Sequence, residues 1–121
     1  AAWATGARYK PLPPARLIDT RSVGIGAGET LRLRVAGMGG VPNTQPTAVV
    51  LNVTVTDTTA GGWLTVFPAE SARPLASSIN FAPGQTVANK VFAQLGPGGY
   101  VDIYNFVGNT HVVVDVQGWF G

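Results

Sequence analysis

Two segments place aromatic side chains at alternate positions beside polar ones, a pattern suited to sugar binding. In residues 63–67 and again in residues 100–104, aromatic residues alternate with aliphatic ones. With the aliphatic side chains in the core, each strand presents two rings that flank a polar residue. Flat rings fit the apolar faces of sugars, and nearby carboxylate, amide or hydroxyl groups bond their hydroxyls. The predicted ligand-binding residues are Trp63, Phe67, Tyr100, Asp102, Tyr104 and Asn105. In the alternative interpretation, Trp63, Phe67 and Tyr104 belong to the core.

Three further residues are secondary candidates for ligand contacts. His111 and Asp115 lie four positions apart in one predicted strand, and therefore on one face of it. They either contact a ligand or belong to a structural network with Asn52, which occupies the position equivalent to Asp115 in a similar strand. Arg21 follows Asp19-Thr20, where it either binds an acidic ligand group or forms a structural latch to a carboxylate or carbonyl.

The residue inventory argues against an enzyme. The chain has a single histidine, no cysteine and no Gly-x-Ser-x-Gly motif, so neither a Ser-His-Asp triad nor a thiolate metal site has support. Its acids can supply two carboxylates, but a domain of this size rarely forms a glycosidase cleft as well as a core. The Gly-rich residues 24–28 lack the Lys-Ser/Thr end of a phosphate loop. We expect a non-catalytic protein with no metal and no cofactor, although a calcium ion held by backbone carbonyls leaves no sequence signal.

Composition favours one extracellular β-domain. The 121 residues match the size of a single domain, and 45% of them are hydrophobic while only 12% are charged. Solubility then rests on uncharged polar residues, a pattern common in secreted β-proteins. The net charge of +2 comes from dispersed cations, so we expect no nucleic-acid partner. No apolar run reaches transmembrane length, so we expect no membrane insertion, and the lack of a visible signal peptide decides nothing.

Glycine and proline divide the chain into short strands. The predicted strands are residues 16–20, 30–35, 47–56, 63–67, 77–81, 86–95, 100–105 and 111–117. Many short strands joined by Gly/Pro turns predict an all-β fold, a single-domain antiparallel β-sandwich of Ig-like or jelly-roll-like type, over residues 15–121. Residues 1–14 contain several prolines and are predicted to form a linker or a strap along the domain edge.

Segments of the two halves also echo each other. The similar pairs are 47–53 with 110–116, 63–67 with 100–104, and 28–31 with 84–87. Their order differs between the halves, so a tandem duplication does not fit. A pseudo-symmetric sandwich with equivalent strands in both sheets explains the echo.

Several ordered motifs resemble a repeat of secreted and cell-surface proteins of actinobacteria. The matching segments are residues 11–21 (PLPPARLIDTR), 47–57, 63–69, 72–74, 78–80, 84–89 and 111–120. The last segment ends in Trp119-Phe120, where Tyr-Phe is more usual. Such repeats occur in tandem or attached to extracellular hydrolases, so the resemblance implies a secreted or cell-surface accessory module. It supplies no ligand and no catalytic residues.

The sequence therefore predicts an extracellular non-catalytic module that binds a polysaccharide or cell-wall glycan through an exposed aromatic face. The alternative is a structural or adhesive repeat that self-associates as a homo-oligomer, stalk or fibre, because a charge-poor surface and unpaired strand edges favour association. A small enzyme is the third hypothesis.

Overall fold

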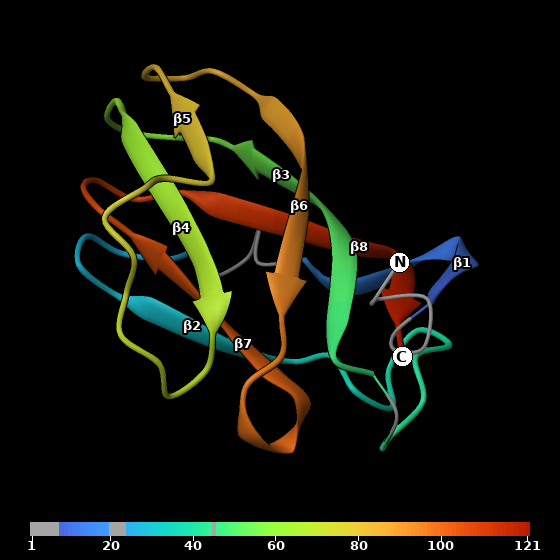
Figure 1. Cartoon of the computed structure of the whole chain (residues 1–121). Coiled ribbons are helices and arrows are strands. Elements are labelled where there is room, and N and C mark those ends of the chain that lie inside the picture. The colour runs from blue at the N-terminus through green and yellow to red at the C-terminus, as the bar shows by residue number, and fades with distance from the viewer. Residues whose placement is uncertain (1–7, 20–23, 45) are drawn as a thin grey trace.

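The fold is built from short strands in which core and surface residues alternate. The computed structural model describes residues 8–19, 24–44 and 46–121. Their strands are β1 (Tyr9–Asp19), β2 (Thr30–Arg34), β3 (Ala48–Thr56), β4 (Gly62–Pro68), β5 (Ile79–Phe81), β6 (Val87–Gln94), β7 (Tyr100–Asn105) and β8 (His111–Phe120), with a short turn η2 (Pro97–Gly99) before β7 (Figure 1). None of the helical segments in this part of the chain has the length and hydropathy of a membrane-spanning helix.

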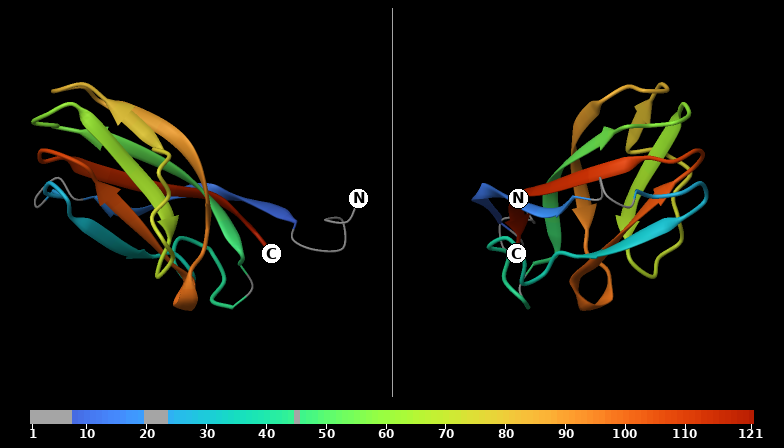
Figure 2. Two further views of the ribbon diagram at one scale, coloured as in Figure 1. Left: turned by 60° about the vertical axis from the view of Figure 1, so that its left-hand side comes forward. Right: turned by 180° about the vertical axis from the view of Figure 1, so that it is seen from behind.

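The strands form two antiparallel sheets that pack face to face. Sheet I has the order β1-β8-β3-β6, and sheet II has the order β2-β7-β4-β5. Figure 2 shows β2, β7 and β4 side by side in one layer. The all-β sandwich of the prediction is confirmed. Two four-stranded sheets with this order make a jelly roll, since an Ig-like constant domain divides its strands four and three.

The core lies between the two sheets and follows the alternation of the strands. Val49, Leu51, Val53 and Val55 of β3 are completely buried, as the period of two predicts. Buried residues of sheet II face them, namely Leu33, Leu64, Val66, Ile79, Val101 and Ile103. Each buried aliphatic side chain contributes roughly 1.5–3 kcal/mol to folding. This core holds the two sheets together, and the alternate side chains of each strand face outward.

The proline-rich segment lies partly in an edge strand. Because β1 begins at Tyr9 and pairs with β8, the domain boundary predicted at residue 15 falls inside a strand. Proline has no N–H for a ladder bond, and an edge strand tolerates this loss. The register of β1 against β8 also shifts between Pro11 and Ala15, which accommodates the prolines between them.

The segments that echo each other in sequence are neighbours in one sheet. β3 and β8 pair in sheet I, and β4 and β7 pair in sheet II. Equivalent positions face each other: Asn52 lies opposite Asp115, and Val66 lies opposite Ile103. A local pseudo-two-fold axis therefore passes between the two central strands of each sheet, and the sequence similarity relates those two strands. The third similar pair, residues 28–31 and 84–87, precedes β2 and β6. These strands lie in different sheets, so this pair is not related by the same axis.

Candidate functional site

A pocket of about 520 Å³ opens on the outer face of sheet II. Its lining residues are Thr30, Arg32, Phe67, Glu70, Ser71, Arg73 and Asp102. Strand register explains the first part of this set, because Arg32 of β2 lies opposite Asp102 of β7, which lies opposite Phe67 of β4. The loop that follows β4 supplies the rest.

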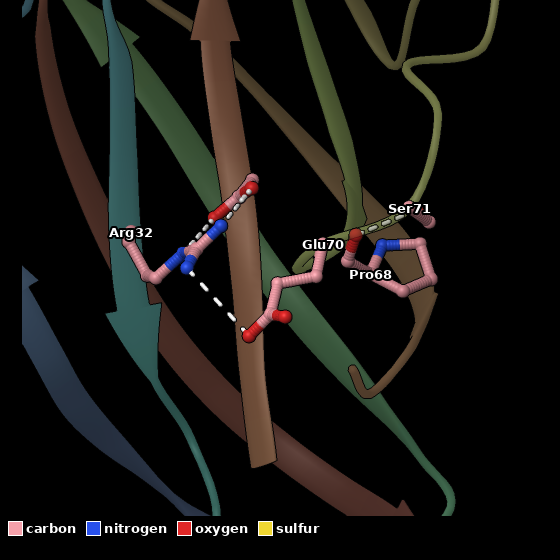
Figure 3. Close-up of polar contacts among 5 residues, drawn as sticks. Arg32, Pro68, Glu70 and Ser71 are labelled. Carbon is pink, nitrogen blue, oxygen red and sulfur yellow. Dashed lines mark hydrogen bonds and ion pairs between the residues drawn. The ribbon is translucent and has the colours of Figure 1, made fainter. Parts of the chain in front are cut away.

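An ion pair lies at the centre of the pocket. The Arg32 guanidinium donates two hydrogen bonds to Asp102, from Nε to Oδ1 over 2.9 Å and from Nη2 to Oδ2 over 3.1 Å. Asp102 is 5% exposed, so the guanidinium supplies the partner that a buried carboxylate needs. The hydrogen bond to Asp102 raises the pKa of Arg32 above its ordinary value. Its Nη1 also lies 3.9 Å from Glu70 Oε2 (Figure 3).

The turn that carries Glu70 is strained and tightly packed. Glu70 has φ 63°, a left-handed conformation that costs energy for a residue with a long side chain. The Ser71 hydroxyl closes the turn by donating to the Pro68 carbonyl over 2.6 Å (Figure 3). Gly96 lets the backbone approach, because a Cβ there would lie 2.6 Å from the Ala69 nitrogen. The turn therefore holds the Glu70 side chain at the rim of the pocket.

Two tyrosines of β7 lie on the outer face near the pocket. The Arg73 guanidinium lies over the Tyr104 ring, 3.8 Å from its centroid, and so covers one face of the ring. The Thr65 hydroxyl donates to the Ala76 carbonyl over 3.4 Å, which ties the loop after β4 down over the sheet. Tyr100 is partly buried and pairs with Arg34 of β2. The tyrosines therefore flank the ion pair and do not form an open platform.

Trp63 is stacked on a neighbour at one end of sheet II. Its ring lies 3.7 Å from that of Phe106 at an interplanar angle of 9°. Phe67 is four residues along the same strand, about 13 Å away, and is 6% exposed. The structure therefore brings Phe67 and Asp102 together in the pocket, with both tyrosines beside it, and places Trp63 apart.

Asn105 lies inside the protein, so it cannot contact a ligand as we predicted. Its side chain is 0% exposed. Nδ2 donates to the Gly108 carbonyl over 2.8 Å, to the Ile25 carbonyl over 2.9 Å and to the Gly26 carbonyl over 3.3 Å. This amide holds two loops together and has a structural role.

The secondary candidates lie away from the pocket. Asp115 is on sheet I, where its Oδ1 accepts a hydrogen bond from Arg16 Nε over 2.7 Å. His111 is partly buried in the same strand, about 13 Å from Asp115 by strand geometry. Arg16 also lies 3.6 Å from Asp19, so these charges form a network within sheet I. Arg21 lies outside the described residues.

Five pocket residues were absent from the predicted site, namely Thr30, Arg32, Glu70, Ser71 and Arg73. The alternation of residues 30–35 predicts that Arg32 faces outward. It does not indicate the partner, because Asp102 is 70 positions away in the sequence. Glu70 carries no local signal for its positive φ. Arg73 appears in the sequence only as part of a motif. The described residues contain no group of three or more His, Asp or Glu side chains placed to hold a metal ion.

The stack of Trp63 on Phe106 gives a spectroscopic prediction. Phe106→Ala should lower the free energy of unfolding by about 1 kcal/mol and shift tryptophan emission to longer wavelength, because one face of Trp63 then meets water. Leu75→Ala is the control, since Leu75 is 102% exposed, and it should change neither quantity. Urea unfolding followed by fluorescence measures both effects. Unchanged emission in Phe106→Ala would show that Phe106 does not shield Trp63.

Comparisons with known proteins give a distant structural likeness. No family model and no curated protein matches the chain. A structure of the tobacco streak virus coat protein dimer is similar with a TM-score of 0.43 and 7% identity, over 92% of this chain and 86% of that one. A structure of the same coat protein in a C2 crystal form also has a TM-score of 0.43 and 7% identity, over 91% of this chain and 85% of that one. At these values the likeness carries no inference about function or assembly.

Proposed function

We propose that the protein is a non-catalytic carbohydrate-binding module whose sugar site is the pocket on sheet II. The observation that carries this proposal is the arrangement of Arg32, Asp102 and Glu70 beside Phe67. A guanidinium between two carboxylates offers both hydrogen-bond donors and acceptors to sugar hydroxyls. Phe67 adds a small apolar floor, as sugar sites combine apolar surface with a few placed polar groups.

The charge of the pocket favours a neutral sugar. Arg32 and Arg73 bring two positive charges, and Glu70 and Asp102 bring two negative ones, so the formal charge of the lining is zero. An acidic sugar would gain from the arginines but would be repelled by the carboxylates. A neutral sugar meets no such repulsion, and the hydroxyls of Thr30 and Ser71 add further hydrogen-bonding groups.

The same geometry supports binding rather than catalysis. Both pocket carboxylates contact one guanidinium, Asp102 by two hydrogen bonds and Glu70 at 3.9 Å. A glycosidase instead uses two carboxylates on opposite sides of the bond that is cleaved. We include in the proposal the setting that the sequence resemblance implies, an accessory module of a secreted or cell-surface protein.

A glycan panel tests the proposal. The purified protein is measured by calorimetry against neutral and acidic soluble oligosaccharides and by retention on insoluble polysaccharides. We expect retention on one class of neutral glycan, with at least ten-fold weaker binding to acidic sugars of the same size. Equal binding to neutral and acidic sugars contradicts the charge argument, and no binding to any glycan overturns the proposed function.

A further inference from the structure

The four strands at the sheet edges differ in how well they are protected against pairing. β1 contains three prolines and two register shifts, β5 has only three residues, and β2 has five residues, two of them arginines. All three features oppose pairing with another strand. β6 has eight residues, no proline and a continuous register against β3, so it is the least protected edge among the described strands.

The outward side of β6 is apolar at its centre. Phe92 is 60% exposed. Its ring contacts that of Phe120 edge-on, with centroids 5.3 Å apart, and Phe120 in turn lies 5.0 Å from Tyr9. This aromatic cluster crosses sheet I from β6 to β1. Its rings are tilted against one another, which does not make the flat platform a sugar needs and suits packing against protein side chains.

We propose that β6 pairs antiparallel with β6 of a second copy of this chain, about a two-fold axis at Val91. A two-fold contact uses the same patch on both copies, so the strand must complement itself. Antiparallel pairing about Val91 places Phe92 of each copy opposite Lys90 of the other, on the outer face of the joined sheet. Each ammonium group then meets an aromatic ring, and the cation–π contact occurs twice.

The alternative registers are less favourable. Pairing about Lys90 would put the two ammonium groups directly opposite each other, and like charges in this position destabilise a sheet. Pairing about Phe92 would place each Lys90 opposite Gln94 of the other copy and lose both cation–π contacts. Lys90 is the one charged residue of β6, so the residue that lies opposite Lys90 decides which register is favoured.

This interface leaves the sugar pocket accessible and does not depend on it. The pocket opens on the outer face of sheet II, whereas β6 is an edge of sheet I. The dimer would therefore present two pockets on one assembly. Two linked sites raise the apparent affinity for a polymeric glycan without any new contact.

Sedimentation equilibrium at millimolar protein tests the proposal. The unmodified chain should be a dimer, and Phe92→Asp should be a monomer with an unchanged circular dichroism spectrum, because its side chain is largely exposed. Leu75→Asp changes an exposed apolar residue outside β6 and should remain dimeric. A monomeric unmodified chain overturns the proposal, and so does a Phe92→Asp variant that remains a dimer.

Cysteine cross-linking tests the register. The chain has no cysteine, so a disulfide in a single-cysteine variant can form only between the introduced residues of two copies. Residues opposite each other in an antiparallel pair have Cα atoms about 4.5–5.5 Å apart, within the range of a disulfide. Val91→Cys should therefore form a covalent dimer on mild oxidation. Gln94→Cys lies opposite Ala88 of the second copy and should not. Cross-linking of Gln94→Cys without that of Val91→Cys would overturn the proposed pairing.

Discussion

Replacing Asn105 with alanine is expected to lower the free energy of unfolding by about 2 kcal/mol. The Asn105 amide is fully buried and donates to three carbonyls, those of Ile25, Gly26 and Gly108. Its removal leaves the Gly108 carbonyl without a donor, whereas the Ile25 and Gly26 carbonyls keep backbone donors. A buried polar group left unsatisfied costs about 1–3 kcal/mol. Urea unfolding followed by circular dichroism measures the loss.

Asn109→Ala is the matched control for this change. Asn109 is exposed and only four residues further along the chain, and its hydrogen bonds to Thr59 use backbone atoms. The control should stay within about 0.5 kcal/mol of the unmodified protein. A stable Asn105→Ala variant that loses sugar binding would contradict the structural role and restore Asn105 to the ligand site.

Replacing Glu70 with glycine should separate binding from stability. Glycine adopts the φ of 63° without strain, so the free energy of unfolding should stay the same or rise by up to about 1 kcal/mol. The variant loses the carboxylate that lies beside Arg32 in the pocket. A hydrogen bond to a charged group contributes about 1.5–3 kcal/mol, so sugar binding should weaken by at least about ten-fold. Calorimetry and thermal unfolding measure the two quantities.

Asp57→Gly is the control for the backbone effect. Asp57 is the other non-glycine residue with a positive φ among the described residues, at 54°, and it does not line the pocket. Its replacement should relieve a similar strain and leave sugar binding unchanged. Equal sugar affinity in both glycine variants would show that the Glu70 carboxylate makes no contact with the ligand.

The sandwich was predictable because its strands show a strict period of two. Val49, Leu51, Val53 and Val55 alternate with polar or half-buried residues, and the structure buries all four. The same rule shows why Asn105 was wrongly assigned. Asn105 lies two and four positions after Ile103 and Val101 in β7, so the three side chains are on the same face of the strand, and all three point inward. Strict use of the alternation would have excluded it from the binding face.

Most of the pocket depends on information that the local pattern lacks. Arg32 and Asp102 meet only because β2 and β7 are neighbours, and strand order follows from the packing of the whole chain. Glu70 and Arg73 belong to the loop after β4, whose course is set by contacts such as that of Gly96 with the backbone of Ala69. No periodicity describes such a loop. The sequence therefore indicates the sheet face of the pocket and leaves its charged rim undetermined.

The most direct test of the central claim is a ¹⁵N NMR titration of the protein with a neutral oligosaccharide taken from the glycan panel. Amide shifts at Arg32, Glu70, Ser71 and Asp102 are the result predicted for a sugar in the pocket on sheet II. Shifts confined to Trp63 and Phe106 would place the sugar on the stacked aromatic pair instead, and no shifts at saturating sugar would contradict carbohydrate binding altogether.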